Sequence, residues 1–368
     1  MKSLEFTWND HRQPADKDAQ DHMKPLEFTR AADLPESWDQ DLGDNIYLHR
    51  FFLRFMEGRS DTQESRYHLF TDASGAPDTR FMSFTRKKFV ITQFFSWFSL
   101  KLFSRFVYVP LSVGRPGVHL GQATADFFWD FVRGLKGMRL VFNLQDGVST
   151  PGFVRITTCP SCVLDVRWNS FDAYMADLRS HYRNRYTKAL KRSAGLKIYK
   201  LEDNSRFGKD LYALYLQTLT RADYKIETLS MEFFRGDFFD IFVMEDESGR
   251  PIAFYQLLKN DDELIFEFTG CDADLVSRHD AYNRMLLEII RYGIENGFTR
   301  IDFGQTAEEA KLRAGCRYKR ISILVSHSNP VLNFALKMFA PLLSYKPIPE
   351  DSFTVFKSTP ARQAGGTP

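Results

Sequence analysis

A repeated pattern of turn-forming residues restricts the folds open to this chain more than any other feature. Residues 67–77, YHLFTDASGAP, predict a strand that enters an acidic turn and then Ser-Gly-x-Pro, and residues 242–251, FVMEDESGRP, predict the same order. Gly75 and Gly249 of the two copies are 174 residues apart. Each copy continues with an apolar strand, and later with a helix that ends in glycine before another strand. Because chance rarely preserves both parts in order, we predict a duplicated α/β unit.

Four segments follow from this duplication. Residues 1–40 are polar, carry three prolines and show no sustained period, so we predict a tail or a strap over the surface. Residues 41–160 are expected to form a first, degenerate half, and residues 161–328 a second half. Residues 329–368 are expected to form an amphipathic segment and a loose tail.

The second half gives the clearer prediction. Apolar residues alternate with other residues over 264–269, which is the period of a strand. Residues 280–296 have one apolar helical face and stop at Gly297, and residues 300–303 predict another strand. A strand, a helix and a strand in this order form a parallel crossover. We therefore expect 264–269 and 300–303 to be parallel neighbours in a mixed sheet.

Composition excludes several classes of protein. Lys and Arg number 49 and Asp and Glu 47, for a formal net charge of +2, so any contact with a polyanion must be local. The chain begins with no signal-peptide pattern and contains no apolar run long enough for a transmembrane helix. It has four cysteines, which favours an internal, reducing location, and we predict a cytoplasmic protein. Cys159 and Cys162 form a CxxC between two expected strands without a second Cys or His pair, so we favour a structural role and expect no metal site.

Three stretches of the second half carry a resemblance to a known superfamily. They are LRSHYRNRY at 178–186, YNRMLL at 282–287 continuing to Gly297, and IDFG at 301–304 followed by Lys311 and Gly315. Together with the order of elements, they resemble the GCN5-related N-acetyltransferase (GNAT) superfamily, and within it the FemAB/BioF2-like acyltransferase branch. The resemblance implies two tandem acyl-CoA N-acyltransferase-like halves, with the BioF2-like acetyltransferase region in 161–328. It also implies that the parallel strands diverge and admit a donor thioester or ester between their ends.

One loop departs from the superfamily pattern. Typical GNAT enzymes hold the pyrophosphate of coenzyme A with a glycine-rich turn, whereas residues 270–279, GCDADLVSRH, contain a single glycine. The Fem-type members, which take aminoacyl groups from tRNA, also generally lack that turn. In this loop and the following helix, the residues predicted to bind the donor are Gly270, Arg278, His279 and Asn283.

Three residues are candidates for catalysis. Glu267 lies within an apolar strand, where burial would raise its pKa and let it deprotonate an ammonium group; the alternative is an acid on a solvent-facing strand. Asp302 could bind the acceptor amine or pair with a neighbouring cation. Tyr282 could donate a proton to the leaving group, or be a core aromatic residue.

Four further residues are candidates for substrate binding. Gly304 ends the strand and would allow a ligand or another backbone segment to approach closely. Lys311 matches a lysine of the FemAB/BioF2-like branch, although an isolated surface lysine is the alternative. Arg183 and Tyr182 belong to the basic run 179–192. This run is either a solvated helix face or a local contact for tRNA or polyphosphate. Two segments, 89–106 and 331–343, could make a peripheral membrane contact, although packing between the halves is the plainer explanation.

We therefore predict an N-acyltransferase that moves an acyl group from an acyl-CoA or a carrier thioester to an amine, without a tightly bound cofactor. One alternative is a Fem-like, aminoacyl-tRNA-dependent transferase acting on a cell-wall precursor. Another is a non-catalytic module at the membrane surface that keeps the GNAT fold.

Overall fold

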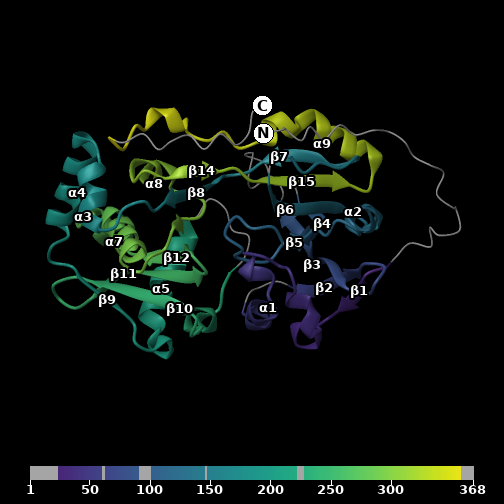
Figure 1. The fold of residues 1–368 in the computed structure, drawn as a ribbon, viewed down its shortest axis with the longest axis horizontal. Helices are drawn as coiled ribbons and strands as arrows, with labels where there is room; N and C mark the ends of the chain where they lie inside the picture. Colours follow the sequence, from purple (N-terminus) through teal and green to yellow (C-terminus); the bar gives the residue numbers. More distant parts are fainter. Residues whose placement is uncertain (1–23, 60–62, 91–100, 146, 222–227, 358–368) are drawn as a thin grey trace, which may run out of the picture.

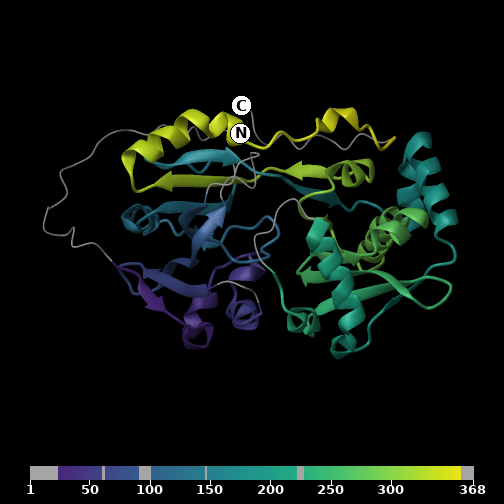
Figure 2. The same cartoon turned by 180° about the vertical axis from the view of Figure 1, so that it is seen from behind.

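The computed structural model describes residues 24–59, 63–90, 101–145, 147–221 and 228–357. These residues form two mixed sheets that lie side by side, the first on the right and the second on the left in Figure 1. Figure 2 shows the same arrangement from behind. The first sheet has the order β1-β2-β3-β4-β6-β15-β7, with β5 beside β3, and the second has the order β14-β8-β13-β12-β11-β10-β9.

The strands of the first sheet are β1 (Leu26–Phe28), β2 (Gln63–Thr71), β3 (Pro77–Val90), β4 (Lys101–Val107), β5 (Val118–His119), β6 (Met138–Leu144), β7 (Val154–Thr157) and β15 (Ser322–His327). Those of the second sheet are β8 (Ser161–Asp165), β9 (Lys197–Lys200), β10 (Phe239–Glu245), β11 (Pro251–Asn260), β12 (Glu263–Cys271), β13 (Arg300–Asp302) and β14 (Arg317–Lys319). The helices are α1 (Arg50–Met56), α2 (Ala125–Gly134), α3 (Phe171–Asp177), α4 (Ser180–Arg192), α5 (Lys209–Arg221), α6 (Ala273–Arg278), α7 (Ala281–Glu295), α8 (Glu308–Arg313) and α9 (Pro330–Leu343).

The duplication predicted from the sequence is confirmed. In the turn between β2 and β3, Asp72 Oδ1 accepts hydrogen bonds from the backbone and the hydroxyl of Ser74 and from the backbone N–H of Ala76. Asp246 accepts the same set in the turn between β10 and β11, from Ser248 and the N–H of Arg250. Each hairpin is followed by a parallel crossover, β4-α2-β6 in the first half and β12-α7-β13 in the second. The chain is therefore a mixed α/β protein with a tandem GNAT-like fold.

The first sheet takes a strand from the second half, which the sequence pattern does not indicate. β8 follows β7 along the chain but pairs with β13 of the second sheet, and β15 follows β14 but pairs with β6 and β7 of the first. The predicted second half, 161–328, thus contains a strand of the first sheet. Because β15 comes from the second half and pairs with β6 and β7, the halves are tied together by backbone hydrogen bonds.

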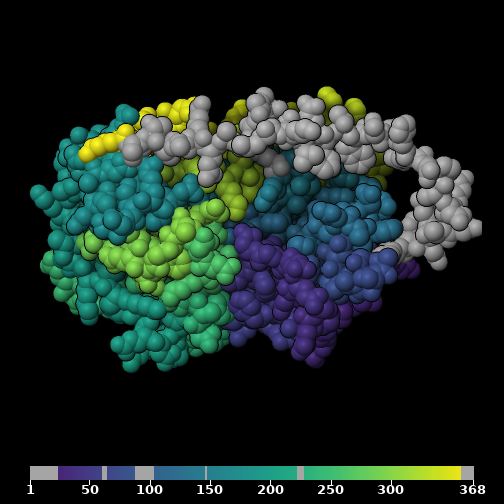
Figure 3. All heavy atoms as spheres, viewed as in Figure 1, coloured from purple at the N-terminus to yellow at the C-terminus, as the bar shows by residue number. Residues whose placement is uncertain are grey.

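One of the apolar clusters of the core also spans the two halves. It includes Trp38, Phe52 and Phe106 from the first half and Phe234 and Phe254 from the second, all essentially inaccessible to solvent. Burying a large apolar side chain contributes roughly 1.5–3 kcal/mol. Figure 3 shows the N-terminal part of the first half directly against the second. The halves therefore hold a fixed geometry at their junction.

The structure describes only part of the segments predicted at the two ends of the chain. Of 1–40, residues 24–40 include β1 and the buried side chain of Trp38, and residues 1–23 lie outside the described residues. The segment after residue 329 begins with α9, which packs on β7 and β15. The predicted lipid segment 89–106 lies partly outside the described residues, which exclude 91–100. Within the described ranges, no helix is long and apolar enough to cross a bilayer.

Candidate active site

The parallel strands β12 and β13 diverge, as predicted. Their pairing runs from Glu263 opposite Arg300 to Ile265 opposite Asp302, and stops there. β12 continues to Cys271, whereas the chain after Asp302 stays beside β8, with the O of Gly304 accepting the N–H of Cys162 at 3.0 Å. The two strands therefore leave a gap at their carboxyl ends.

A β-bulge lies in β12 where the gap begins. Leu257 of β11 pairs with Phe266 and Gln256 pairs with Phe268, so Glu267 has no partner residue on β11. A bulge breaks the alternation of a strand and redirects a side chain. Glu267 is thereby placed on the wall of the gap rather than on a solvated sheet face.

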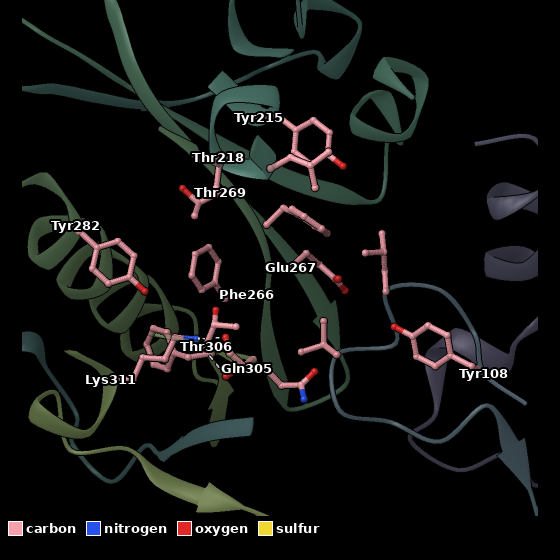
Figure 4. Close-up of a pocket in the computed structure, with 16 residues that line it drawn as sticks. Tyr108, Tyr215, Thr218, Phe266, Glu267, Thr269, Tyr282, Gln305, Thr306 and Lys311 are labelled. Carbon is pink, nitrogen blue, oxygen red and sulfur yellow. Dashed lines mark hydrogen bonds between the residues drawn. The ribbon is translucent and has the colours of Figure 1, made fainter. Parts of the chain in front are cut away.

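The gap is a cavity of about 310 Å³ between the two halves (Figure 4). Its lining residues come from a loop of the first half and from β12, α5, α7 and the turn after β13 in the second. They are Tyr108, Leu111, Val113, Tyr215, Thr218, Leu219, Phe266, Glu267, Phe268, Thr269, Tyr282, Phe303, Gly304, Gln305, Thr306 and Lys311. The cavity thus contains Glu267, Tyr282, Gly304 and Lys311, four of the residues singled out from the sequence.

Glu267 has an unusual environment for a carboxyl group. Its Oε1 accepts a 2.5 Å hydrogen bond from the hydroxyl of Tyr47, and its Oε2 is buried without a hydrogen-bond partner among the described residues. Burial raises the pKa of Glu267 to about 8, even though the bond from Tyr47 and the charge of Arg115 lower it. The solvent-facing alternative is therefore wrong, because only 9% of the residue is exposed. A carboxyl with such a pKa can take up and release a proton near neutral pH.

The groups that hold Glu267 come from the first half. Tyr47 lies in a 3-10 turn at Ile46–Leu48 and is fully buried, and burial raises its pKa well above the ordinary value, so it stays a donor. Arg115 pairs with Glu263 at the start of β12 and lies 5.8 Å from the centre of the Tyr47 ring. Sequence reasoning missed both residues, because no local pattern marks them and their partners are 220 and 148 positions away.

Asp302 organises the turn that borders the cavity. Its Oδ1 accepts hydrogen bonds from the hydroxyl of Ser161 and, at 2.9 Å, from the N–H of Gly304, while its Oδ2 is buried without a partner among the described residues. Gly304 has a φ of +68°, and a Cβ there would lie 3.3 Å from Val113. Asp302 does not line the cavity itself, so its direct effect is on the shape of the turn.

Lys311 is buried, and the interpretation as a plain surface lysine is wrong. Its Nζ donates to the carbonyl oxygens of Gly304 at 3.1 Å and Gln305 at 2.7 Å, and the residue is 2% exposed. Burial lowers the pKa of the ammonium group, while nearby Asp302 opposes this. Lys311 therefore fixes the same turn from α8 and presents its side chain to the cavity.

Tyr282 faces the cavity from the first turn of α7 (Figure 4). Burial raises its pKa, so the phenol keeps its proton at neutral pH. Tyr282 also packs against the apolar core of the second half. The two interpretations from the sequence, proton donor and core aromatic residue, are therefore compatible in the structure.

The predicted donor-binding residues surround α6 instead of a glycine-rich turn. Gly270 lies under α5, where a Cβ would come within 2.6 Å of the backbone nitrogen of Tyr215, so close packing requires a glycine there. Arg278 is exposed and His279 half-buried at the end of α6. Asn283 donates to Asp280 Oδ1 at 2.7 Å. Their role in donor binding stays a prediction.

The basic helix α4 borders a second cavity of about 450 Å³. That cavity is lined by His181, Asn184, Arg185, Lys188, Arg192 and Asp280, which we call the α4 groove. The predicted substrate residues of α4 lie elsewhere: Arg183 donates to the carbonyl oxygens of Ala176 and Leu178, and Tyr182 packs on the core. In the described ranges, no group of His, Cys, Asp or Glu side chains is arranged to hold a metal ion.

Comparisons with known proteins match part of the chain to a family. Residues 177–320 match the family described as "Acetyltransferase (GNAT) domain". A search among curated proteins finds no match. The range 177–320 includes both diverging strands and every lining residue of the second half.

Several solved structures are similar in fold at low identity. One is the C-terminal domain assigned to a lysylphosphatidylglycerol synthetase from Agrobacterium fabrum, with 14% identity, 79% of this chain and 90% of that chain covered, and a TM-score of 0.48. FemX has 11% identity, with 74% of this chain and 90% of that chain covered, and a TM-score of 0.47. A GCN5-related N-acetyltransferase from Sphaerobacter thermophilus has 11% identity, with 76% of this chain and 85% of that chain covered, and a TM-score of 0.39.

The superfamily inferred from the sequence is therefore confirmed by the family match over the part of the chain that builds the cavity. Residues 177–320 match the acetyltransferase (GNAT) family, and this match supports acyl transfer as the type of reaction.

Proposed function

We propose that the protein transfers an acyl group to an amine in the cavity at the ends of β12 and β13, with Glu267 as the base. The observation that carries this proposal is the buried carboxyl of Glu267, whose Oε2 has no hydrogen-bond partner among the described residues and whose pKa is about 8. An alkyl ammonium has a pKa of about 10, so an ordinary carboxylate at about 4.3 is a poor base for it. The raised pKa of Glu267 reduces this mismatch.

In the proposed reaction, Glu267 takes a proton from the ammonium group of the acceptor. The freed amine nitrogen forms a bond to the acyl carbon of the donor, and the bond from that carbon to the thiol or alcohol oxygen of the leaving group breaks. Tyr282 donates its hydroxyl proton to the leaving group and recovers one from the nitrogen, which is now an amide. The products are the N-acyl acceptor, the free thiol or alcohol, and one proton that Glu267 releases to solvent.

An acyl-CoA or a carrier thioester is the first candidate donor. The superfamily resemblance supports it. The loop expected to hold the pyrophosphate contains α6 in place of a glycine-rich turn. A binding mode for coenzyme A would therefore use contacts other than that turn. A cytoplasmic location, which the four free cysteines favour, is part of this proposal.

An aminoacyl ester of tRNA is the second candidate donor, and the α4 groove favours it. Arg185 and Lys188 in this groove have no ion-pair partner among the described residues. The groove and the active-site cavity meet at the start of α7, since Asp280, the residue before the helix, lines one and Tyr282 lines the other. A donor with phosphates in the groove could therefore place its reactive ester in the cavity.

A thermal-shift screen separates the two donors. Acyl-CoAs of different chain length and aminoacylated tRNA are compared, and the donor that stabilises the protein is then assayed for transfer to amines. A tRNA donor predicts binding that weakens steeply with salt, with a shallower salt dependence in Arg185→Ala/Lys188→Ala. Lys197→Ala, an exposed lysine of β9, is the control. Stabilisation by an acyl-CoA, unchanged in the double variant, would exclude the tRNA donor, and no transfer by any donor would contradict the proposed function.

A further inference from the structure

Helix α9 exposes an apolar face that is large for a surface helix. It holds six of the eleven large apolar side chains that are exposed in the described part of the chain. These six are Val331 (72% exposed), Leu332 (43%), Phe334 (65%), Met338 (62%), Phe339 (55%) and Leu342 (74%). Its other side packs on β7 and β15, where Ala340 is buried. Contiguous exposed apolar surface of this kind marks an interaction site.

The charged residues of α9 and of the segment that follows it, up to residue 349, are all basic. Residues 328–349 contain no Asp or Glu, and they contain Lys337 and Lys346, both exposed. Neither lysine forms an ion pair with another described residue. An apolar helix face with basic residues and no acids is typical of helices that lie in the interface of an anionic membrane.

We propose that α9 docks the protein on the surface of a membrane that contains anionic phospholipids. Fourteen residues make a helix about 21 Å long, which is shorter than a bilayer core of about 30 Å, so α9 would lie along the surface. The stripe Val331, Phe334, Met338 and Leu342 would enter the acyl region, and Lys337 and Lys346 would contact the headgroup phosphates.

A second copy of the chain fits this face less well than a lipid surface does. A two-fold contact through α9 would place the same patch against itself. Lys337 would then approach a patch without any acid to pair with it, and like charges across an interface oppose association. An anionic lipid surface supplies the missing negative charge.

The docking face has a direct structural link to the active site. After α9 the chain hydrogen-bonds to β7, through the N–H of Tyr345 and the O of Thr157 at 2.8 Å. It then reaches α8, where the N–H of Ile348 lies 3.5 Å from Glu308 Oε2. Figure 1 shows α9 and this segment along one side of the molecule, above both sheets. Docking through α9 would therefore hold the helix that carries Lys311 on the membrane side. This inference does not depend on the identity of the donor or the acceptor.

Vesicle sedimentation tests the proposal with the full chain. Wild-type protein is mixed with phosphatidylcholine vesicles, with or without phosphatidylglycerol, and is expected to sediment with the anionic vesicles. The variant Phe334→Ser/Met338→Ser/Leu342→Ser should reduce that binding by about tenfold or more, because three apolar side chains no longer enter the lipid. Lys337→Glu should weaken binding only to the vesicles that contain phosphatidylglycerol. All three serine positions are exposed, so the melting temperature should stay near that of the wild type.

Leu26→Ser is the matched control. Leu26 is 56% exposed on β1, away from α9, and this variant should bind vesicles as the wild type does. The proposal is wrong if the wild type does not bind anionic vesicles, or if the triple variant binds them equally well. It is also wrong if the wild type is a dimer that ignores vesicles and the triple variant is a monomer, because the face would then join two copies.

Discussion

The two parallel crossovers of this protein begin alike and end differently. In the second half, β12 and β13 diverge into the active-site cavity. In the first half, β4 and β6 pair from Ser104–Val107 to Met138–Val141, and the loop after β4 is hydrogen-bonded to the end of β6. Asn143 of β6 donates to Ser112 Oγ at 3.3 Å and to the O of Arg115 at 3.0 Å, both in that loop.

This difference shows how one copy of a duplicated unit can contribute residues to the site of the other copy. The loop after β4 also carries Tyr108, Leu111 and Val113, which line the cavity of the second half. The same loop supplies Arg115, which pairs with Glu263. The first half therefore forms one wall of the active-site cavity of the second half. Four substitutions can break or sharpen this comparison.

The largest effect is expected at Glu267, the proposed base in the crossover of the second half. Glu267→Gln keeps the shape of the side chain and removes its ability to accept a proton, so the rate of acyl transfer should fall by roughly 10²-fold or more. Transfer is measured with the donor found in the screen. Glu247→Gln, an exposed carboxyl in the β10–β11 turn, should leave the rate unchanged. Equal rates in both variants would remove Glu267 from the reaction.

The next effect is expected at the turn that holds the cavity open. Lys311→Ala removes the donors to the carbonyl oxygens of Gly304 and Gln305. It leaves two buried acceptors without this donor and creates a hole, so we expect transfer to fall by about tenfold or more and the free energy of unfolding by about 2–4 kcal/mol. Chemical denaturation measures the second quantity. An unchanged unfolding free energy would mean that Lys311 does not support the turn.

A smaller effect should reveal the contribution of the first half to the chemistry. Tyr47→Phe removes the hydrogen bond that lowers the pKa of Glu267, so that pKa should rise further. The base must be ionised to act, and its ionised fraction grows as pH rises through the pKa. The rising limb of the pH–rate profile should therefore move to higher pH, with about tenfold less activity at pH 7 if the shift is about one unit.

Tyr67→Phe is the control for this experiment. Tyr67 is another buried tyrosine of the first half, and it donates to Glu57, away from the cavity. Its loss should leave the pH–rate profile in place. A loss of activity in Tyr47→Phe that is equal at every pH would indicate a structural role alone.

The smallest effect on activity is expected from a substitution in the crossover of the first half. Asn143→Ala removes two hydrogen bonds to the loop 112–115, so the free energy of unfolding should fall by about 1–3 kcal/mol. The rate of transfer should change little, because Arg115 keeps its pairing with Glu263. A large loss of activity with normal stability would mean that the first half does more than provide a wall.

The parts of this structure that depend on local pattern could be predicted from the sequence. The turns at Asp72 and Asp246 use contacts within four residues, and the crossover 264–303 follows from periodicity and Gly297. Glu267 was found because an acid in an apolar strand is a local feature.

The parts that depend on distant contacts could not be predicted. Tyr47 and Arg115 gain their roles only through packing between the halves, and the pairing of β15 with the first sheet leaves no local signal. Gly270 gives a local signal in the sequence, but the signal has more than one structural explanation. A glycine at a strand end fits either a phosphate-binding turn or a close helix contact, and the structure places it under α5.

The titration of Glu267 tests the account most directly, because it requires no substrate. Glutamate is labelled with ¹³C at the side-chain carboxyl, and the carbon resonances are followed by NMR across the pH range. The account predicts one buried carboxyl with a pKa of about 8, absent in Glu267→Gln and shifted upwards in Tyr47→Phe. If every glutamate titrates near the ordinary value of about 4.3, the cavity contains no base suited to an amine, and the central claim is contradicted.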